Sequence, residues 1–398
     1  MTKKPAGYTA PAVEALMDVD DEMVIVGKTR CSEFVGNGEF TSTTPCGPLP
    51  YTDRADRWQA SGASSTGAAA ALASYPWLDI CVATDTAASI RDPAAISGIY
   101  GWRPSWGMFP MDGICPGIEV ADTVGLLSRD PSVLTGSIRK WVSKSKNLRL
   151  TSNPKRITKI LVPNDDLSIM QPEVRKALES FVNSAKAISG GQYSVQYMNM
   201  QKTMSVWKGM MTGEEFTNLW GLYQYKHIGK GIMDSYQAKH GGKNPPLGHN
   251  TQTTWKKARD TDDAESRIRS LEKKSHATGD YVRHFLGTDT VLMDLMDGDR
   301  LPEFREESFQ GESQKLLRGK SKNPMVYWKD IPCGQGQGYT CPFDQVSYLS
   351  PISDAKEMQT ISMGLYGGPG TDLAIADLID HFSENGLLVS VKPGETAF

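Results

Sequence analysis

Two serine-bearing turns lie close together in the first quarter of the chain, and serine can act as a nucleophile. Ser64 and Ser65 follow Gly62 in the small-residue run SGASSTGAAAA, and Ser89 lies in CVATDTAASIRDPAAISGIYGWRPSWG. A serine hydroxyl attacks a carbonyl poorly until a neighbouring base removes its proton. Two serines and a base could therefore form and hydrolyse an acyl intermediate, whereas a lone serine on such a turn is more often a helix cap.

Other short motifs do not indicate a competing chemistry. Gly27-Lys28-Thr29 resembles the end of a phosphate-binding loop, but Glu22 stands where that motif needs another glycine. No serine lies in a G-x-S-x-G elbow. The six histidines form no H-E-x-x-H pair and the six cysteines form no C-x-x-C pair. We therefore expect no metal site, no cofactor and no disulfide framework.

The two serine runs resemble the two conserved blocks of the amidase signature family of serine amide hydrolases, which read GGSSGGSAAA and GTDTGGSIRxPAAxxGxxGxKPTxG. They match in order and in spacing. Weaker similarity extends through residues 10–13, 26–29 and 33–34, and residues 361–372 resemble the family's closing strand and turn. The resemblance implies an α/β fold with a large mixed β-sheet core covered by helices on both faces. It favours a single domain over residues 1–398.

Members of that family hydrolyse carboxamides with a Ser-Ser-Lys triad. The resemblance implies that Ser89 is the nucleophile. It also implies that Ser64, preceded by a cis peptide bond, passes protons between the lysine and Ser89. The backbone N–H groups of Thr86, Ala87 and Ala88 would then form the oxyanion hole, where donors stabilise the charge that develops in the transition state.

Four further residues are expected to support this site. Asp85 and Arg91 flank the nucleophile turn, and we expect them to pair and hold it. Ser65 adjoins Ser64. Lys28 belongs to the segment that matches the family's GKT element, which favours a structural role over that of catalytic base.

The sequence departs from the family pattern at two places. Ala87 and Ala88 replace paired glycines, which predicts a strained or narrowed oxyanion hole. The family's lysine lies well before the helix matched by residues 10–18, whereas nine residues precede that helix here, and the context of Lys3 and Lys4 differs. We therefore expect the lysine block to be missing and the chain to be truncated relative to the family. One hypothesis is an amide hydrolase; the alternative is a catalytically impaired member that binds a ligand or a protein.

Composition restricts the partners. The chain has 398 residues, of which 39% are hydrophobic, and its 43 basic residues nearly balance 46 acidic ones. Such a balance gives no net electrostatic field strong enough to attract nucleic acid. The sequence shows no membrane span or secretion signal. We expect a cytoplasmic protein with a small-molecule amide substrate. If an N-terminal face is uncovered, we expect oligomers to form through it.

The elements that must position these turns follow from periodicity and turn residues. We predict helices over residues 10–18, 61–73, 130–143, 171–189 and 372–382. We predict strands over residues 23–26, 79–83, 99–103, 157–163, 193–197, 327–332, 346–349, 361–366 and 387–391. A polar helical cover is expected over residues 204–286. Four aromatic residues within it indicate core packing rather than a substrate pocket: Trp207, Trp220, Tyr223 and Tyr225.

Overall fold

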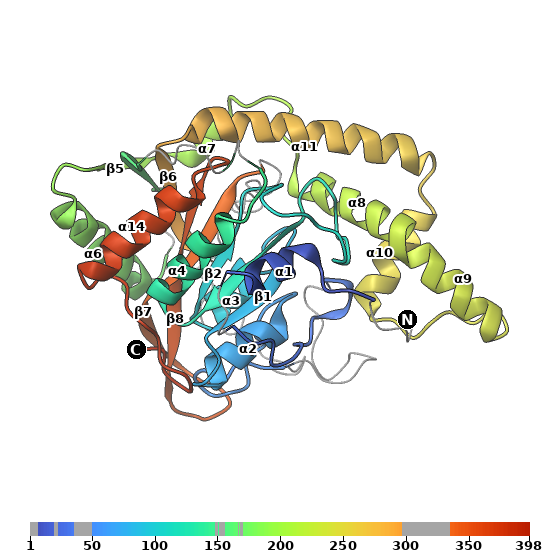
Figure 1. Ribbon diagram of the computed structural model, residues 1–398, viewed down its shortest axis with the longest axis horizontal. Coiled ribbons are helices and arrows are strands. Elements are labelled where there is room, and N and C mark those ends of the chain that lie inside the picture. The colour runs from blue at the N-terminus through green and yellow to red at the C-terminus, as the bar shows by residue number, and fades with distance from the viewer. Residues whose placement is uncertain are drawn as a thin grey trace.

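A single mixed sheet forms the centre of the molecule (Figure 1). The computed structural model describes residues 7–19, 23–35, 50–147, 150, 156–165, 167, 170–296 and 335–398. The strand order is β1-β3-β2-β7-β8-β6-β4-β5. Strand β4 pairs in parallel with β5 and β6, and the other pairs are antiparallel. The strands are β1 Ile80–Asp85, β2 Tyr100–Arg103, β3 Thr123–Ser128, β4 Lys159–Pro163, β5 Ser194–Met198, β6 Thr290–Met296, β7 Gln337–Leu349 and β8 Lys356–Gly367.

Helices cover both faces of this sheet. In β2 the Trp102 indole nitrogen donates to Asp372 of α14, whereas a Cβ on Gly101 would meet Ala94 of α3. Because successive strand residues point to opposite faces, α14 and α3 lie on opposite sides. The helices are α1 Pro11–Met17, α2 Thr66–Ser74, α3 Arg91–Ile96, α4 Pro131–Val142, α6 Pro172–Ile188, α7 Met200–Met204, α8 Gly213–Gln224, α9 Lys230–Lys239, α10 His249–Arg259, α11 Ala264–Leu286 and α14 Asp372–Glu384, with a 3₁₀ turn η1 Glu33–Val35 and a π-helical turn η2 Tyr225–Gly229.

Helix α4 shows how local sequence sets an element. Asp130 accepts hydrogen bonds from the backbone N–H groups of Ser132 and Val133, and Pro131 occupies the first turn. The buried face includes Leu134 and Trp141. The predicted start at residue 130 is therefore confirmed.

Two predicted strands are wrong. Residues 23–26 join no strand in the described part of the chain, and Val24, Ile25 and Val26 are 73%, 56% and 66% exposed. A β-branched run becomes a strand only where a neighbouring strand accepts its backbone hydrogen bonds. Residues 387–391 also form no strand, because the apolar pattern there reflects the burial of Leu388 and Val391 in the core.

Other differences arise from short elements. Strands β3 and β6 and helix α3 were not predicted, since a short apolar run does not distinguish strand from helix and α3 contains Pro93. Helix α2 begins later than predicted. The predicted strand at 327–332 lies outside the described residues. The strands predicted at 346–349 and 361–366 are parts of the longer β7 and β8.

Helices α8 to α11 occupy most of residues 204–286 and extend to one side of the sheet, at the right and top of Figure 1. A second apolar cluster joins this helical cover to the loop before β3, and it includes Ile118, Phe216, Leu222 and Leu271. None of the helices in the described part of the chain combines the length and apolar character that crossing a bilayer requires.

Candidate functional site

The two serine turns meet in the structure. The backbone N–H of Ser65 donates to the Ser89 carbonyl at 3.2 Å. Ser64 is 9% exposed and Ser89 is 4% exposed, so both lie at the edge of the buried interior. The Ala63–Ser64 peptide bond is cis, as the resemblance implies. Residues 25 positions apart in the sequence are thus brought into one site.

Gly62 allows the first turn to approach α3. Its φ of 74° lies in the left-handed region, and a Cβ there would stand 2.9 Å from both Asp92 Oδ2 and Pro93 Cα. The neighbouring N–H of Ala63 donates to Asp92 Oδ2 at 3.2 Å. Glycine is therefore required for the contact between the turn that carries Ser64 and the helix that follows Ser89.

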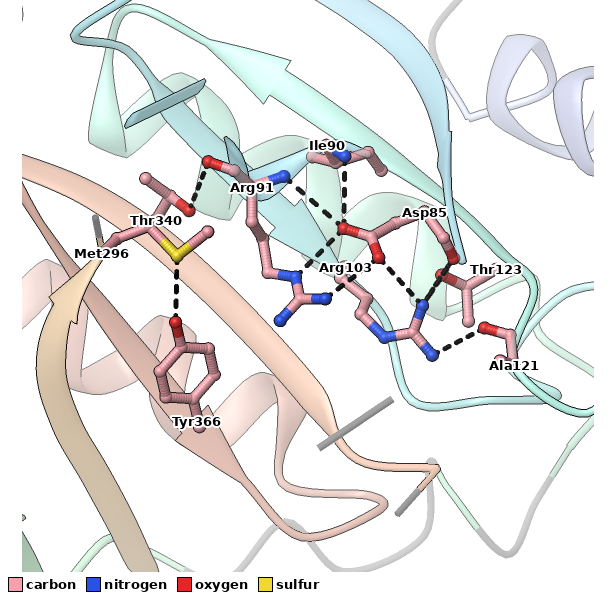
Figure 2. A network of polar contacts seen from close by, with 9 residues as sticks. All are labelled: Asp85, Ile90, Arg91, Arg103, Ala121, Thr123, Met296, Thr340 and Tyr366. Atoms are coloured by element: carbon pink, nitrogen blue, oxygen red, sulfur yellow. Dashed lines mark hydrogen bonds and ion pairs between the residues drawn. The ribbon is translucent and has the colours of Figure 1, made fainter. Parts of the chain in front are cut away.

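A buried ionic network holds the second turn (Figure 2). Arg91 donates through Nε to Asp85 Oδ2 and through Nη2 to Oδ1, each at 3.0 Å. Arg103 Nη1 contacts Asp85 Oδ1 at 3.2 Å, and the N–H of Ile90 donates to Oδ2 at 3.2 Å. The three charged side chains are fully buried. The Asp85–Arg91 pair confirms the predicted pairing, whereas the participation of Arg103, from β2, was not predicted.

Electrostatics keep Asp85 charged in the folded state. Burial alone would raise the pKa of its carboxyl, but Arg91 and then Arg103 outweigh burial and hold that pKa below its usual range. Burial lowers the pKa of Arg103 to about 10, with Asp85 opposing the shift. The carboxylate therefore acts as a permanent anchor for both guanidinium groups.

The backbone between Asp85 and Ile90 leaves hydrogen-bond donors available. Within the described residues, the N–H groups of Ala87, Ala88 and Ser89 make no hydrogen bond, whereas that of Ile90 is bound by Asp85. Such donors beside a serine are what an oxyanion hole requires.

The predicted backbone strain at the two alanines is not found. Neither Ala87 nor Ala88 has a positive φ, so the turn does not need the freedom of glycine. Their methyl groups instead pack against two apolar clusters. Ala88 packs into a cluster that includes Met204 and Leu286, and Ala87 packs against the cluster formed by the helical cover.

Asp122 is a site residue that the sequence analysis missed. Its Oδ1 accepts from the Thr86 hydroxyl at 2.6 Å and from the Ile118 N–H at 2.9 Å, and its Oδ2 accepts from the Gly117 N–H at 2.7 Å. Burial raises the pKa of Asp122, with these hydrogen bonds opposing the shift. Asp122 thus joins the loop before β3 to the start of the nucleophile turn. The only sequence signal was an acidic residue directly before an apolar run.

Among the described residues, no basic side chain contacts the Ser64 or Ser89 hydroxyl. Among these residues, neither the Ser64 nor the Ser89 hydroxyl has a hydrogen-bond partner, and the Lys28 side chain is exposed. The segment after Lys28 does reach the site, since the Ser32 N–H donates to the Ser64 carbonyl at 3.1 Å. The described residues also contain no group of three potential metal ligands.

The aromatic residues of the helical cover take different positions. Trp207 stacks on Tyr281 with ring centroids 5.9 Å apart, and Trp220 and Tyr223 pack in the cluster around α8. These three follow the core-packing interpretation. Tyr225 also packs against that cluster and, in addition, lines a cavity between η2 and α10.

Known proteins are similar to this chain in sequence. The sequence profile of the family described as Amidase matches residues 1–293. Amidase 1 of Oryza sativa subsp. japonica is 33% identical over 177 residues, which cover 43% of this chain and 33% of that protein. Amidase 1 of Arabidopsis thaliana is 30% identical over 224 residues, which cover 54% of this chain and 49% of that protein.

The overall fold is also shared with a solved structure. Allophanate hydrolase of Kluyveromyces lactis aligns with a TM-score of 0.70 at 18% identity, covering 99% of this chain and 60% of that one. The aligned part of this chain spans 33% and 49% of the lengths of the two curated relatives. The predicted fold class is confirmed by this likeness.

Proposed function

Because the chain belongs to the amidase family, we propose that it hydrolyses the carbon–nitrogen bond of small carboxamides through an acyl-enzyme on Ser89. The observation that carries the proposal is the junction of the two serine turns, where the Ser65 N–H meets the Ser89 carbonyl. Beside this junction lie backbone N–H groups that have no partner among the described residues. This arrangement supports the proposal, because a serine nucleophile and the donors for its oxyanion would then be neighbours.

In the proposed reaction, Ser89 Oγ attacks the amide carbon. Its proton passes to Ser64 Oγ as Ser64 gives its own proton to a base. The Thr86, Ala87 and Ala88 N–H groups bind the oxyanion of the tetrahedral intermediate. The carbon–nitrogen bond then breaks, the leaving nitrogen takes a proton from Ser64, and Ser64 regains one from the protonated base. A water molecule next attacks the ester on Ser89, which yields the carboxylic acid and restores the serine hydroxyl.

The proton acceptor for Ser64 is the remaining element of the triad. The family resemblance implies a lysine, and the contacts of the described residues supply none. If a base is lacking, a small alkylamine added to the buffer should raise the rate of reaction at Ser89, and removing the Ser64 hydroxyl should abolish this rescue. Equal rates with and without the amine, together with fast turnover, would indicate a base within the chain.

The direct test is intact-mass spectrometry after treatment with a serine-directed fluorophosphonate. We expect one adduct on the wild type and none on Ser89→Ala. The matched control is Ser97→Ala, which removes another buried serine hydroxyl. A well-folded wild type that takes no label, with or without added amine, would contradict the proposal and favour the ligand- or protein-binding alternative.

We also propose that the chain forms a single domain and has a cytoplasmic location.

We further propose that two copies associate through the N-terminal segment. Val24, Ile25 and Val26 form an exposed apolar run, and such runs favour contact with another surface. Sedimentation velocity should show self-association that decreases in Ile25→Lys. A monodisperse monomer at high concentration would contradict association.

A further inference from the structure

A cavity of about 380 Å³ lies within the helical cover, away from the residues of both serine turns. Its wall combines residues of η2, of the loop that precedes α10 and of α10 itself. This volume falls within the range of small-molecule pockets in proteins. Figure 1 shows these elements at the right of the molecule, beyond the edge of the sheet.

The wall of the cavity is partly aromatic and rigid. Trp255 is 2% exposed and its indole nitrogen donates to Gln224 Oε1 at 2.8 Å. Phe34 packs on the Trp255 ring at 4.8 Å between centroids, and Tyr225 lies 6.4 Å from it. Tyr225 begins the π-helical turn. Such turns are rare in proteins, and those that occur are often at functional sites.

The rim of the cavity carries positive charge. The two cations are Lys256 and Arg259. The imidazole of His249 also lines the cavity, and none of the described residues in its lining is acidic. Arg259 Nε is paired with Asp260 Oδ1 at 2.8 Å, and the two side chains are 50% and 51% exposed. The Asn244 Oδ1 accepts from Gln237, so the donor nitrogen is the group that Asn244 can offer to a ligand.

We infer that this cavity binds a small arylcarboxylate. Its ring would pack beside Trp255 and Tyr225, and its carboxylate would face Lys256 and Arg259. Aromatic packing and a charge-assisted hydrogen bond act together in such a site. The inference does not depend on the proposed amide hydrolysis.

The cavity is connected to the serine turns through the segment that follows Arg30. The Ser32 N–H bonds the Ser64 carbonyl, Glu33 accepts from the Gly248 N–H at 2.8 Å, and the Phe34 carbonyl accepts from Gln224 at 3.1 Å. One short segment therefore touches both the Ser64 turn and the cavity wall. Occupancy of the cavity should reduce hydrogen exchange in this segment.

The test is isothermal titration calorimetry of the full chain with phenylacetate. We expect saturable binding of one molecule per chain, and no saturable binding of benzyl alcohol or benzylamine, which lack the carboxylate. The double variant Lys256→Gln with Arg259→Gln should weaken phenylacetate binding about tenfold or more. A matched control is Lys257→Gln with Lys273→Gln, which changes the net charge equally at exposed residues outside the cavity.

Three outcomes would overturn the inference: no saturable binding of phenylacetate, equal binding of benzyl alcohol, or equal weakening in the control double variant. Circular dichroism of each variant shows whether its helices are retained. Because binding is measured without turnover, the result stands apart from labelling of Ser89.

Discussion

The ion pairs of the serine turns are buried, whereas ion pairs of the helical cover are exposed to solvent. At the turns, Asp85, Arg91 and Arg103 form ion pairs with no solvent exposure. In the cover, the pair Lys226–Glu265 has side chains 41% and 56% exposed, and Lys230–Asp234 has side chains 64% and 59% exposed. Removing one partner of a buried pair leaves an uncompensated charge, whereas an exposed pair is replaced by water.

This difference indicates how each region serves the molecule. In the proposed reaction the turns require one geometry, because the nucleophile and the oxyanion donors must keep their relative positions. Because most of its ion pairs are exposed, we expect the cover to tolerate polar substitutions at its surface. Substitutions matched between the two regions can therefore test the comparison.

The largest effect is expected for Asp85→Asn. It leaves Arg91 and Arg103 buried without their anion, and we expect a loss of about 3–5 kcal/mol in the free energy of unfolding. Urea denaturation measures this loss. Glu265→Gln, which breaks the exposed pair with Lys226, should leave the midpoint unchanged. Similar effects of the two substitutions would remove the distinction between the regions.

Asp122→Asn should have the next largest effect. The amide would present a donor to the Gly117 N–H, and we expect a loss of about 1–3 kcal/mol together with slower fluorophosphonate labelling of Ser89. Because burial raises the pKa of Asp122, the folded state binds this proton more tightly than the unfolded state does. The stability of the wild type relative to Asp122→Asn should therefore increase as pH falls from neutral to about 4. Asp112→Asn, an exposed change in the same loop, is the control for both measurements.

Glycine substitutions should have opposite signs in the two regions. Gly62→Ala places a methyl group against Asp92 and Pro93 in a left-handed conformation, and we expect a loss of about 1–2 kcal/mol. Gly231→Ala lies in α9 with open space around it, and we expect a gain of about 0.5–1 kcal/mol. The midpoint temperatures of thermal denaturation of the two variants and the wild type measure these changes. A stabilising Gly62→Ala would contradict the close approach of the two turns.

The smallest effect is expected at Glu215, in the capping box of α8. Burial opposes the shift, but Lys274 and the Thr212 N–H together outweigh burial and hold the pKa of Glu215 below its usual range. Its contribution to stability is therefore present above about pH 4.3 and lost as pH falls below that value. Glu215→Gln should cost about 0.5 kcal/mol at neutral pH and less at pH 3, in urea titrations at both values. Glu214→Gln, which removes the neighbouring carboxylate in the first turn of α8, is the control variant.

Much of the site follows from the sequence because its contacts are local. The Asp85–Arg91 pair joins residues six positions apart, and the α4 cap at Asp130 joins residues two and three positions apart. The order and spacing of the two serine runs carried the family resemblance and, with it, the fold. Side chains that act within one turn leave a pattern that can be read along the chain.

Only the tertiary structure decided which distant residues complete the site. Arg103 reaches Asp85 from β2, Asp122 reaches Thr86 across the loop before β3, and Trp255 meets Phe34 over more than half of the chain. Periodicity also predicted a strand at residues 23–26, where no partner strand lies in the described residues. Local sequence fixes which backbone conformations and apolar faces are favoured. Strand pairing, buried charge compensation and cavities depend on which segments become neighbours, and packing of the whole chain determines that.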